Sequence, residues 1–400
     1  MTQRPLSGIR ILDSTSMTAG PWGVQILADL GAEVIKIERP GRQCDVNRRL
    51  PVSAHNTSSY FMCMNKDKKS IELDYSKPGH KELFLKLVEK CDVVTENFKA
   101  GSMKRQGLDY ETLKQIKPDL VYSAVSGYGQ TGPNSGLPAV DIVVQATSGI
   151  MSVSGDVGSE GMKGGSSLAD VYASTCSALS ILAGILYRME TGEGVMCDTS
   201  MQSTCMTMVG YDLAKYLNTG EIARPNGNAD REIGFFETVP TNDGLVMVEA
   251  ATQEHFAAFT KLLGVEELTQ DIRFQTPESR RLHTKELEEV FFPLTGEYSM
   301  AQLADQCRAA GVPAGEVNTQ ERLMRTSYVE DQNLYGIVHD KRFGDCKTLN
   351  LPIHFDQFEI PKTREGAQAG EHTSQVLHEL LGLSEEEIQQ LYSYEGAVKV

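Results

Sequence analysis

The stretch GIRILDSTSMTAGPWGVQILADLGAEVIKIE, residues 8–38, decides the fold. Its first segment, GIRILDS, is short and apolar, GPWGVQILADLG has apolar residues at helical spacing, and AEVIKIE is rich in β-branched residues. Pro21 suits the first turn of the helix, where its missing N–H has no bond to lose, and Gly31 is placed to end that helix. The stretch therefore predicts a β-α-β unit.

The next part of the chain repeats this alternation. Apolar and helical segments follow one another in the order KSIELDY (69–75), GHKELFLKLVEK (79–90), DVVTENF (92–98) and LVYSAVSGYG (120–129). Strands that alternate with helices in this way predict an α/β fold with an open, Rossmann-like, mostly parallel sheet.

A polar stretch with turn residues, EIARPNGNADREIG (221–234), marks a change of organisation. After it, FFETVPTNDGLVMVEA predicts a β-hairpin with Asn242-Asp243-Gly244 at its turn, followed by helices to about residue 310. The tail predicts a return to the first domain and ends in two amphipathic helices, the second capped by Ser384. We expect a large α/β domain from both chain ends (1–200 and 345–400), a smaller α+β domain (225–325), and linkers at 201–224 and 326–344.

The composition is that of a globular protein with room for two cores: 400 residues, of which 40% are hydrophobic and 23% are charged. The formal net charge of −16 argues against a nucleic-acid partner, because nucleic-acid binders concentrate lysine and arginine. The opening lacks a signal-peptide layout, and we expect no apolar stretch of the roughly 20 residues that a membrane helix needs, which predicts a cytoplasmic protein without a membrane partner. The eight cysteines form no CxxC pair and the eight histidines lack metal-ligand spacing, so we expect no metal.

The turn MTAGPWG invites comparison with a dinucleotide-binding loop, with Glu38 as the acid that would bind the ribose. However, Gly20 and Gly23 do not make GxGxxG, and Pro21 removes a donor N–H where pyrophosphate would bind. The sequence therefore disfavours a nicotinamide enzyme. It favours helix entry against a close backbone neighbour as the use of this turn.

Basic residues gather at two predicted strand ends. They are Lys36, Arg39 and Arg42 in one group, and Lys99, Lys104 and Arg105 in the other. Because ligands of an open α/β sheet bind beyond the carboxyl ends of the strands, these side chains could hold phosphates. The alternative is a solvated rim of charges.

Two carboxylates have surroundings that suggest chemistry: Asp141 in GLPAVDIVVQATSG and Asp170 in SSLADVYAS. An acid at the head of a helix is most often an N-cap, which is one hypothesis for Asp170, and buried structural hydrogen bonding is one for Asp141. The other hypothesis for Asp170 is a covalent nucleophile toward an activated acyl group, with free N–H groups of the helix end stabilising the oxyanion.

Six motifs, in order along nearly the whole chain, carry a resemblance to a known family. They are LSGIRILDSTSMTAGPWGVQILADLGAEVIKIERPG, NKDKKSIELDY, VTENFKAGSMKRQGLDYETLKQIKPDLVYSAVSGYGQTGP, DIVVQATSGIMSVSG, LADVYAS and GEHTSQVLHELLGLSEEEIQQL. Together they resemble the class III CoA-transferase (CaiB/BaiF) family, which includes formyl-CoA transferase and the carnitine CoA-transferase. The resemblance implies a large domain from both chain ends, a small domain from the middle, and two chains threaded through each other as an interlocked homodimer.

The resemblance also implies a reaction, in which coenzyme A moves from an acyl-CoA donor to a free carboxylic acid without a metal. Asp170 matches the family nucleophile, which forms an acyl-aspartyl anhydride and then an aspartyl-CoA thioester. Asp141 and Thr18 match supporting positions, although some family members have glutamine where this chain has Thr18. The residues that match CoA-contacting positions are Ala19, Arg39, Leu73, Asn97, Phe98 and Arg105.

Two other functions remain open. The α-methylacyl-CoA racemases of the same superfamily have a histidine directly before the acid that matches Asp141, whereas this chain has Val140, which cannot transfer a proton. The second alternative is a CoA-binding protein that has this fold but no catalytic activity. The donor and acceptor acids are not defined by the sequence, although small polar residues at Thr18, Ser166 and Ser167 favour a short or dicarboxylic acid.

Overall fold

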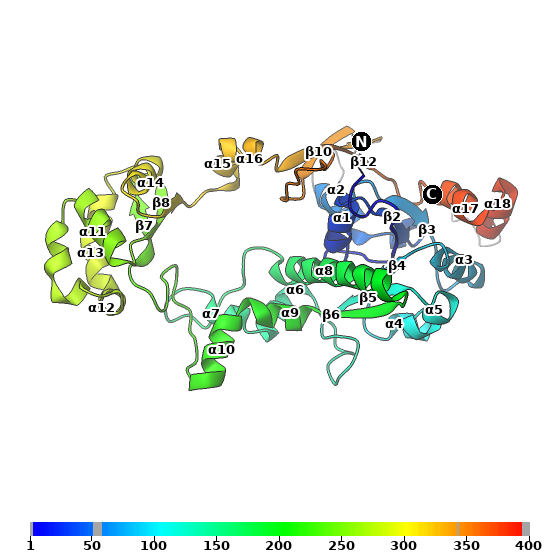
Figure 1. Ribbon diagram of the computed structural model, residues 1–400, viewed down its shortest axis with the longest axis horizontal. Coiled ribbons are helices and arrows are strands. Elements are labelled where there is room, and N and C mark those ends of the chain that lie inside the picture. The colour runs from blue at the N-terminus through cyan, green and yellow to red at the C-terminus, as the bar shows by residue number, and fades with distance from the viewer. Residues whose placement is uncertain (1–2, 51–57, 342–343, 394–400) are drawn as a thin grey trace. The chain divides into compact units, whose positions relative to one another are not determined.

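The computed structural model describes residues 3–50, 58–341 and 344–393 (Figure 1). The chain forms two compact units. The large unit comprises Met1–Ile150, Gly164–Gly220 and Tyr328–Val400, and the small unit comprises Met151–Lys163 and Glu221–Ser327.

A six-stranded sheet forms the centre of the large unit, and all its neighbouring strands are parallel. Its order is β3-β2-β1-β4-β5-β6. The strands are β1 (Arg10–Asp13), β2 (Glu33–Glu38), β3 (Lys69–Glu72), β4 (Val93–Glu96), β5 (Val121–Ser126) and β6 (Val195–Ser200). The predicted α/β fold with a parallel sheet is confirmed, and the strand order reverses between β1 and β4.

Helices cover both faces of this sheet, which explains why its strands are apolar on both sides. Ile11 of β1 belongs to a core with α1 (Pro21–Asp29) and α8 (Leu168–Thr191). Leu12, the next residue, belongs to the opposite core with α3 (Pro78–Val88), α5 (Tyr110–Ile116) and α17 (Thr373–Leu381). The C-terminal helix α17 thus packs on β3 and α3, as a return of the tail to the sheet requires (Figure 1).

The glycine-containing turn after β1 brings α1 and α8 into backbone contact. A Cβ at Gly23 would lie 2.1 Å from the carbonyl oxygen of Ser174, so only glycine fits there. The N–H of Gly23 donates to Ser174 Oγ at 2.6 Å. The expected use of this turn, helix entry against a close backbone neighbour, is confirmed.

Helix α8 corrects the expectation that no apolar stretch is long enough for a membrane helix. Its 24 residues and its mean hydropathy would allow it to span a membrane, by length and composition alone. Of the 18-residue window that is most apolar in this helix, 44% is buried inside the structure. The helix packs on α1, β5 and β6, with Ala173, Ala178 and Ile181 among its buried residues. One face of this apolar helix is therefore part of the core on the parallel sheet, while Leu179, Leu186 and Met189 are exposed.

The other elements of the large unit include helices around the sheet. They are α2 (Ser59–Met64), α4 (Ser102–Arg105), α6 (Asp141–Thr147), α9 (Met201–Met208), α10 (Gly210–Thr219), α16 (Ser327–Asp331) and α18 (Glu385–Ser393). The short helix α7 (Ile150–Val153) begins at the last residue of a large-unit segment and continues into the small unit. The predicted cap of the last helix is present, since Ser384 Oγ accepts the N–H of Glu387 at 3.3 Å.

Two predicted boundaries differ from the structure. Residues 151–163, expected in the large domain, belong to the small unit. The expected linker 326–344 contains β10 (Tyr335–Asp340), which pairs with β11 (Gly344–Leu349) and β12 (Thr363–Gly366), so the chain rejoins the large unit at Tyr328. The other expected linker is mostly helical, as α9 and α10. The pairing of β10 with β12 is distant in sequence, so turn signals did not reveal it.

The small unit contains the predicted hairpin, β7 (Phe236–Thr241) and β8 (Gly244–Glu249), to which β9 (Ala314–Glu316) adds a third strand. Its helices include α11 (Gln253–Leu262), α12 (Pro277–Leu282), α13 (Thr284–Thr295), α14 (Met300–Ala309) and α15 (Gln320–Leu323). Its core contains a group of phenylalanines around Phe291. The predicted α+β class of this region agrees with these elements.

Candidate active site

The cavity that contains Asp170 lies at the carboxyl edge of the six-stranded sheet and has a volume of about 460 Å³. Its lining comes from loops that follow three strands, β1, β4 and β5, together with α6 and α8. Its lining includes Ser16, Met17, Ala19, Asn97, Phe98, Lys99, Val140, Asp141 and Asp170. Because the strand order reverses between β1 and β4, this edge is where an open α/β sheet binds ligands.

Asp170 is the third residue of α8 and is half-buried. Ser167 occupies the N-cap position, so the N-cap hypothesis for Asp170 is wrong. Burial and the negative charge of Asp141 raise the pKa of Asp170 to about 7. A carboxylate that is this basic is a better nucleophile than an ordinary aspartate once it is ionised.

Asp141 supplies the cap that α8 needs. Its Oδ1 accepts the N–H of Ala169 at 2.8 Å and the N–H of Asp170 at 3.3 Å. The N–H groups of Leu168 and Val171 donate to local carbonyl oxygens. The expectation that free N–H groups of this helix end stabilise an oxyanion is therefore wrong, since the Asp141 carboxylate already occupies them.

Gln145, which is not among the predicted site residues, fixes Asp141 in this position. It is fully buried, and its Nε2 donates to Asp141 Oδ2 at 2.6 Å and to the carbonyl oxygen of Ser166 at 3.2 Å. Its Oε1 accepts the N–H of Gly164 at 2.9 Å. One amide therefore ties the approach to α8 to the carboxylate that caps it. Its helical spacing from Asp141, i to i+4, was the only available signal.

We predict that Asp141→Asn shifts the acid limb of the pH–rate profile to lower pH by about one unit. Removing the Asp141 charge removes one of the two causes that raise the pKa of Asp170, so the nucleophile ionises at lower pH. Initial rates from pH 5 to 9 measure the shift, and Asp156→Asn, an exposed change in the small unit, is the control. An unmoved limb with a well-folded variant would contradict the coupling.

The loops after β1 and β4 are joined by Asn97. Its Oδ1 accepts the N–H of Ser16 at 2.9 Å, and its Nδ2 donates to the Ser16 carbonyl oxygen at 2.7 Å. Thr18 is buried nearby, and its Oγ1 lies 2.8 Å from the hydroxyl of Tyr60. The side chain of Asn97 therefore holds the cavity wall together across the point where the strand order reverses.

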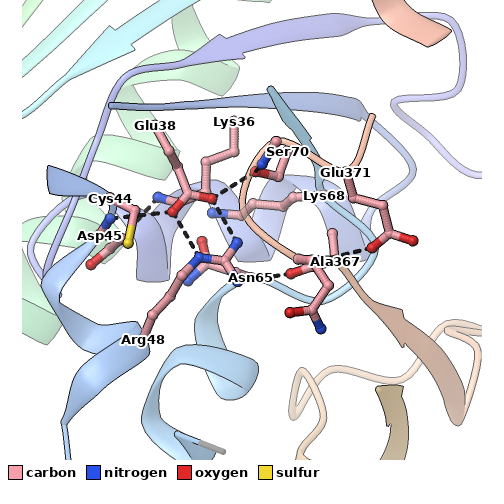
Figure 2. A network of polar contacts seen from close by, with 12 residues as sticks. Lys36, Glu38, Cys44, Asp45, Arg48, Asn65, Lys68, Ser70, Ala367 and Glu371 are labelled. Carbon is pink, nitrogen blue, oxygen red and sulfur yellow. Dashed lines mark hydrogen bonds and ion pairs between the residues drawn. The ribbon is translucent and has the colours of Figure 1, made fainter. Parts of the chain in front are cut away.

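A buried network of charges supports the loop after β1, and Figure 2 shows its members Lys36, Asp45 and Lys68. Lys36 pairs with Asp45 at 3.0 Å and donates to the carbonyl oxygen of Thr15 at 2.8 Å. Lys68 pairs with Asp13 at 3.0 Å and donates to the carbonyl oxygen of Pro21 at 3.2 Å. The two lysines thus hold both ends of the loop that lines the cavity.

This network corrects two expectations. Lys36 is 1% exposed and holds the backbone, so it is not available to phosphates. Glu38, the candidate ribose-binding acid, is also buried, and accepts two hydrogen bonds from Arg48 and one from Ser70 Oγ at 2.7 Å (Figure 2). Both residues stabilise the fold at the end of β2.

A second, smaller cavity of about 190 Å³ is lined by Arg39, Leu73 and Phe98. Ser16 and Phe98 line both cavities, so the two adjoin at these residues. Arg39 is exposed and Leu73 is buried. Three of the six residues expected to contact CoA therefore line the smaller cavity, and Ala19 and Asn97 line the larger one with Phe98.

Arg105 and Lys104 lie on α4 and line neither cavity. The Arg105 guanidinium donates to Ser102 Oγ at 2.9 Å. Lys99 does line the larger cavity. The side chain of Arg42 lies outside the described residues. In the described part of the chain, no group of three or more His, Cys, Asp or Glu side chains is arranged to hold a metal ion.

Comparisons with known proteins identify the class of this protein. The model of CoA-transferase family III matches residues 6–373, and the chain belongs to that family. It is 32% identical to a succinate–glutarate CoA-transferase of Agrobacterium fabrum, over 94% of this chain and 96% of that protein. It is 34% identical to an acetyl-CoA:oxalate CoA-transferase of Acetobacter aceti, over 91% and 92% of the two chains.

A solved structure agrees with this assignment. A CAIB/BAIF family protein from Brucella suis superposes with a TM-score of 0.85 at 29% identity, covering 94% of this chain and 100% of that one. The resemblance to the class III family is thus confirmed. The chain is an enzyme of the CoA-transferase class, whose substrates are CoA thioesters.

Proposed function

We propose that this protein transfers coenzyme A between two carboxylic acids, with Asp170 as the covalent nucleophile. The observation that carries this proposal is the position of Asp170, a half-buried carboxylate with a raised pKa in the cavity at the carboxyl edge of the sheet. Asp170 also matches the family nucleophile by sequence. Perturbed acids in such cavities are candidates for catalysis.

The proposed first half-reaction has two steps. A carboxylate oxygen of Asp170 attacks the thioester carbon of the donor, the C–S bond breaks, and coenzyme A leaves as the thiolate. The thiolate then attacks Cγ of Asp170 in the resulting anhydride, forming an aspartyl-CoA thioester and releasing the donor acid as its carboxylate. The acceptor carboxylate attacks the same Cγ, and the steps run in reverse to regenerate Asp170. One thioester replaces another, so no net proton transfer and no ATP are needed.

Asp141 and Thr18 have supporting roles in this proposal. Asp141 keeps the first turn of α8 in place and makes Asp170 more basic, through hydrogen bonds and charge. Thr18 is held by Tyr60 and positions the backbone beside Ala19. Neither residue exchanges a proton in the steps above.

For the substrates, we propose short dicarboxylic acids and their CoA thioesters. The names of two similar proteins refer to succinate, glutarate and oxalate, all of which are dicarboxylic. We place the nucleotide end of CoA at the smaller cavity with Arg39 and Leu73, and the thioester end at the larger one with Ala19 and Asn97. Phe98 lies where the two meet, and Arg105 would reach CoA from α4.

The test is incubation with succinyl-CoA and glutarate in deuterated water without ATP, followed by mass spectrometry of the CoA products. The proposal predicts glutaryl-CoA without deuterium at the α-carbon. Deuterium incorporation without an acceptor would favour the racemase alternative, for which Val140 offers no acid or base. CoA binding without turnover over a panel of donors and acceptors would favour the binding-protein alternative.

We also propose a homodimer in the cytoplasm. Exposed apolar side chains on two helices of the large unit support a partner chain: Leu179, Leu186 and Met189 on α8, and Tyr211 and Leu217 on α10. Large apolar side chains that are this exposed are typical of helix faces that a partner chain covers. Light scattering after size exclusion measures the mass, and a monomer at micromolar concentration would contradict the proposal.

A further inference from the structure

Met17 has a backbone conformation that a side chain disfavours. Its φ is +64°, in the left-handed region where glycine is the usual residue. The residue nevertheless carries a long apolar side chain that is 47% exposed and lines the cavity with Asp170. Strained residues of this kind cluster at functional sites, where the surrounding structure holds them.

The surrounding structure does hold Met17, through both of its backbone polar groups. Its N–H donates to Asp45 Oδ1 at 3.3 Å, and its carbonyl oxygen accepts Nδ2 of Asn47 at 2.5 Å. Asp45 also accepts the N–H of Asn47 at 3.0 Å and is itself paired with Lys36, and all three of these holding residues are at least nine-tenths buried. The side chain is thus presented by a rigid clamp rather than by a loose loop.

The position of Met17 indicates what it meets. Its neighbour Ser16 lines both cavities, whereas Met17 lines only the cavity that contains Asp170. If the nucleotide occupies the smaller cavity and the thioester meets Asp170, Met17 lies on the acyl side of that path. A methionine is flexible and polarisable, which suits contact with aliphatic chains.

We propose that Met17 contacts the acyl chain of the bound thioester and favours chains longer than acetyl. This inference rests on the proposed function. Because a hydrophobic contact with one or two methylenes changes kcat/KM about tenfold or more, removing the Met17 side chain should penalise glutaryl-CoA and spare acetyl-CoA.

The test compares kcat/KM for acetyl-CoA, succinyl-CoA and glutaryl-CoA with one fixed acceptor, in the parent protein and in Met17→Gly. Glycine keeps the left-handed backbone and both clamp bonds, so the fold is preserved. We expect the ratio of kcat/KM for glutaryl-CoA to kcat/KM for acetyl-CoA to fall about tenfold in Met17→Gly. The Kd for free CoA should stay within about twofold of the parent value. Met17→Asn, which also tolerates this backbone, should give the same fall and serves if the glycine variant is unstable.

Asn333→Gly is the matched control, because Asn333 has a φ of +52° outside the catalytic cavity and its replacement should leave the ratio unchanged. A ratio that stays within about twofold of the parent value, or rises, contradicts the proposal. So does an equal loss for every donor with weaker CoA binding, since that would place Met17 against CoA itself. Turnover by the parent protein tests the proposed function separately, so the two failures are distinguishable.

Discussion

Asp170→Asn is expected to lower kcat for CoA transfer by at least about 10⁴-fold while making the folded protein more stable. The amide cannot form the anhydride, so the covalent route is lost. The gain in stability follows from the raised pKa: the folded protein binds the Asp170 proton more tightly than the unfolded chain, so ionisation costs folding free energy as pH rises from about 4 to 7. Above pH 7 the full pKa shift would correspond to about 4 kcal/mol, and because Asp170 is partly exposed we expect the variant to be more stable by about 2 kcal/mol.

Initial rates and urea denaturation at pH 5 and pH 8 check both parts of this prediction. The gain in stability should be larger at pH 8 than at pH 5, and Asp156→Asn, at an exposed position, should change neither rate nor stability. Transfer at the parent rate by Asp170→Asn would contradict the role of this residue. An inactive variant of lower stability at pH 8 would contradict the electrostatic account.

Lys68→Met should destabilise the large unit by about 3–5 kcal/mol and weaken CoA binding. Lys68 is buried and pairs with Asp13, so its loss leaves a buried carboxylate without its cation. The variant also loses the bond to the Pro21 carbonyl oxygen, which holds the end of the loop that lines the cavity. Both the free energy of unfolding and the Kd for CoA should therefore change.

The adjacent residue provides a matched control. Lys69 pairs with Glu33 at 2.8 Å, but both side chains are about a third exposed, and such pairs contribute about 0–1 kcal/mol. Lys69→Met should therefore have little effect on stability or CoA binding. Equal effects of the two substitutions in urea denaturation and calorimetric titration would contradict the role given to the buried pair.

Local sequence patterns were sufficient to predict the main elements of the sheet. The apolar segments around Ile11, Ile35 and Val94 became parallel strands, because both faces of each strand are buried. Pro21 and Gly31 flank the first helix as expected. Strand β10 was not predicted, because only its pairing with β11 and β12, which come later in the chain, identifies it as a strand.

The candidate site was only partly predictable. Asp170 was identified by its place at the head of a helix and by resemblance, but its cap comes from Asp141, 29 residues earlier. No local pattern shows that the N–H groups of α8 are occupied. Lys36 illustrates the opposite error, because a lysine at a strand end resembles a phosphate ligand until tertiary structure buries it beside Asp45.

In the proposed reaction Asp170 forms covalent acyl and CoA intermediates. The most direct measurement is mass spectrometry of the protein incubated with succinyl-CoA and quenched with hydroxylamine, with Asp170→Asn treated in the same way. We expect a hydroxamate on the parent peptide that contains Asp170 and on no peptide of the variant. The exchange of OH for NHOH makes this peptide about 15 Da heavier than the free acid. A turning-over parent protein without a hydroxamate at Asp170, or with one at another residue, would contradict it.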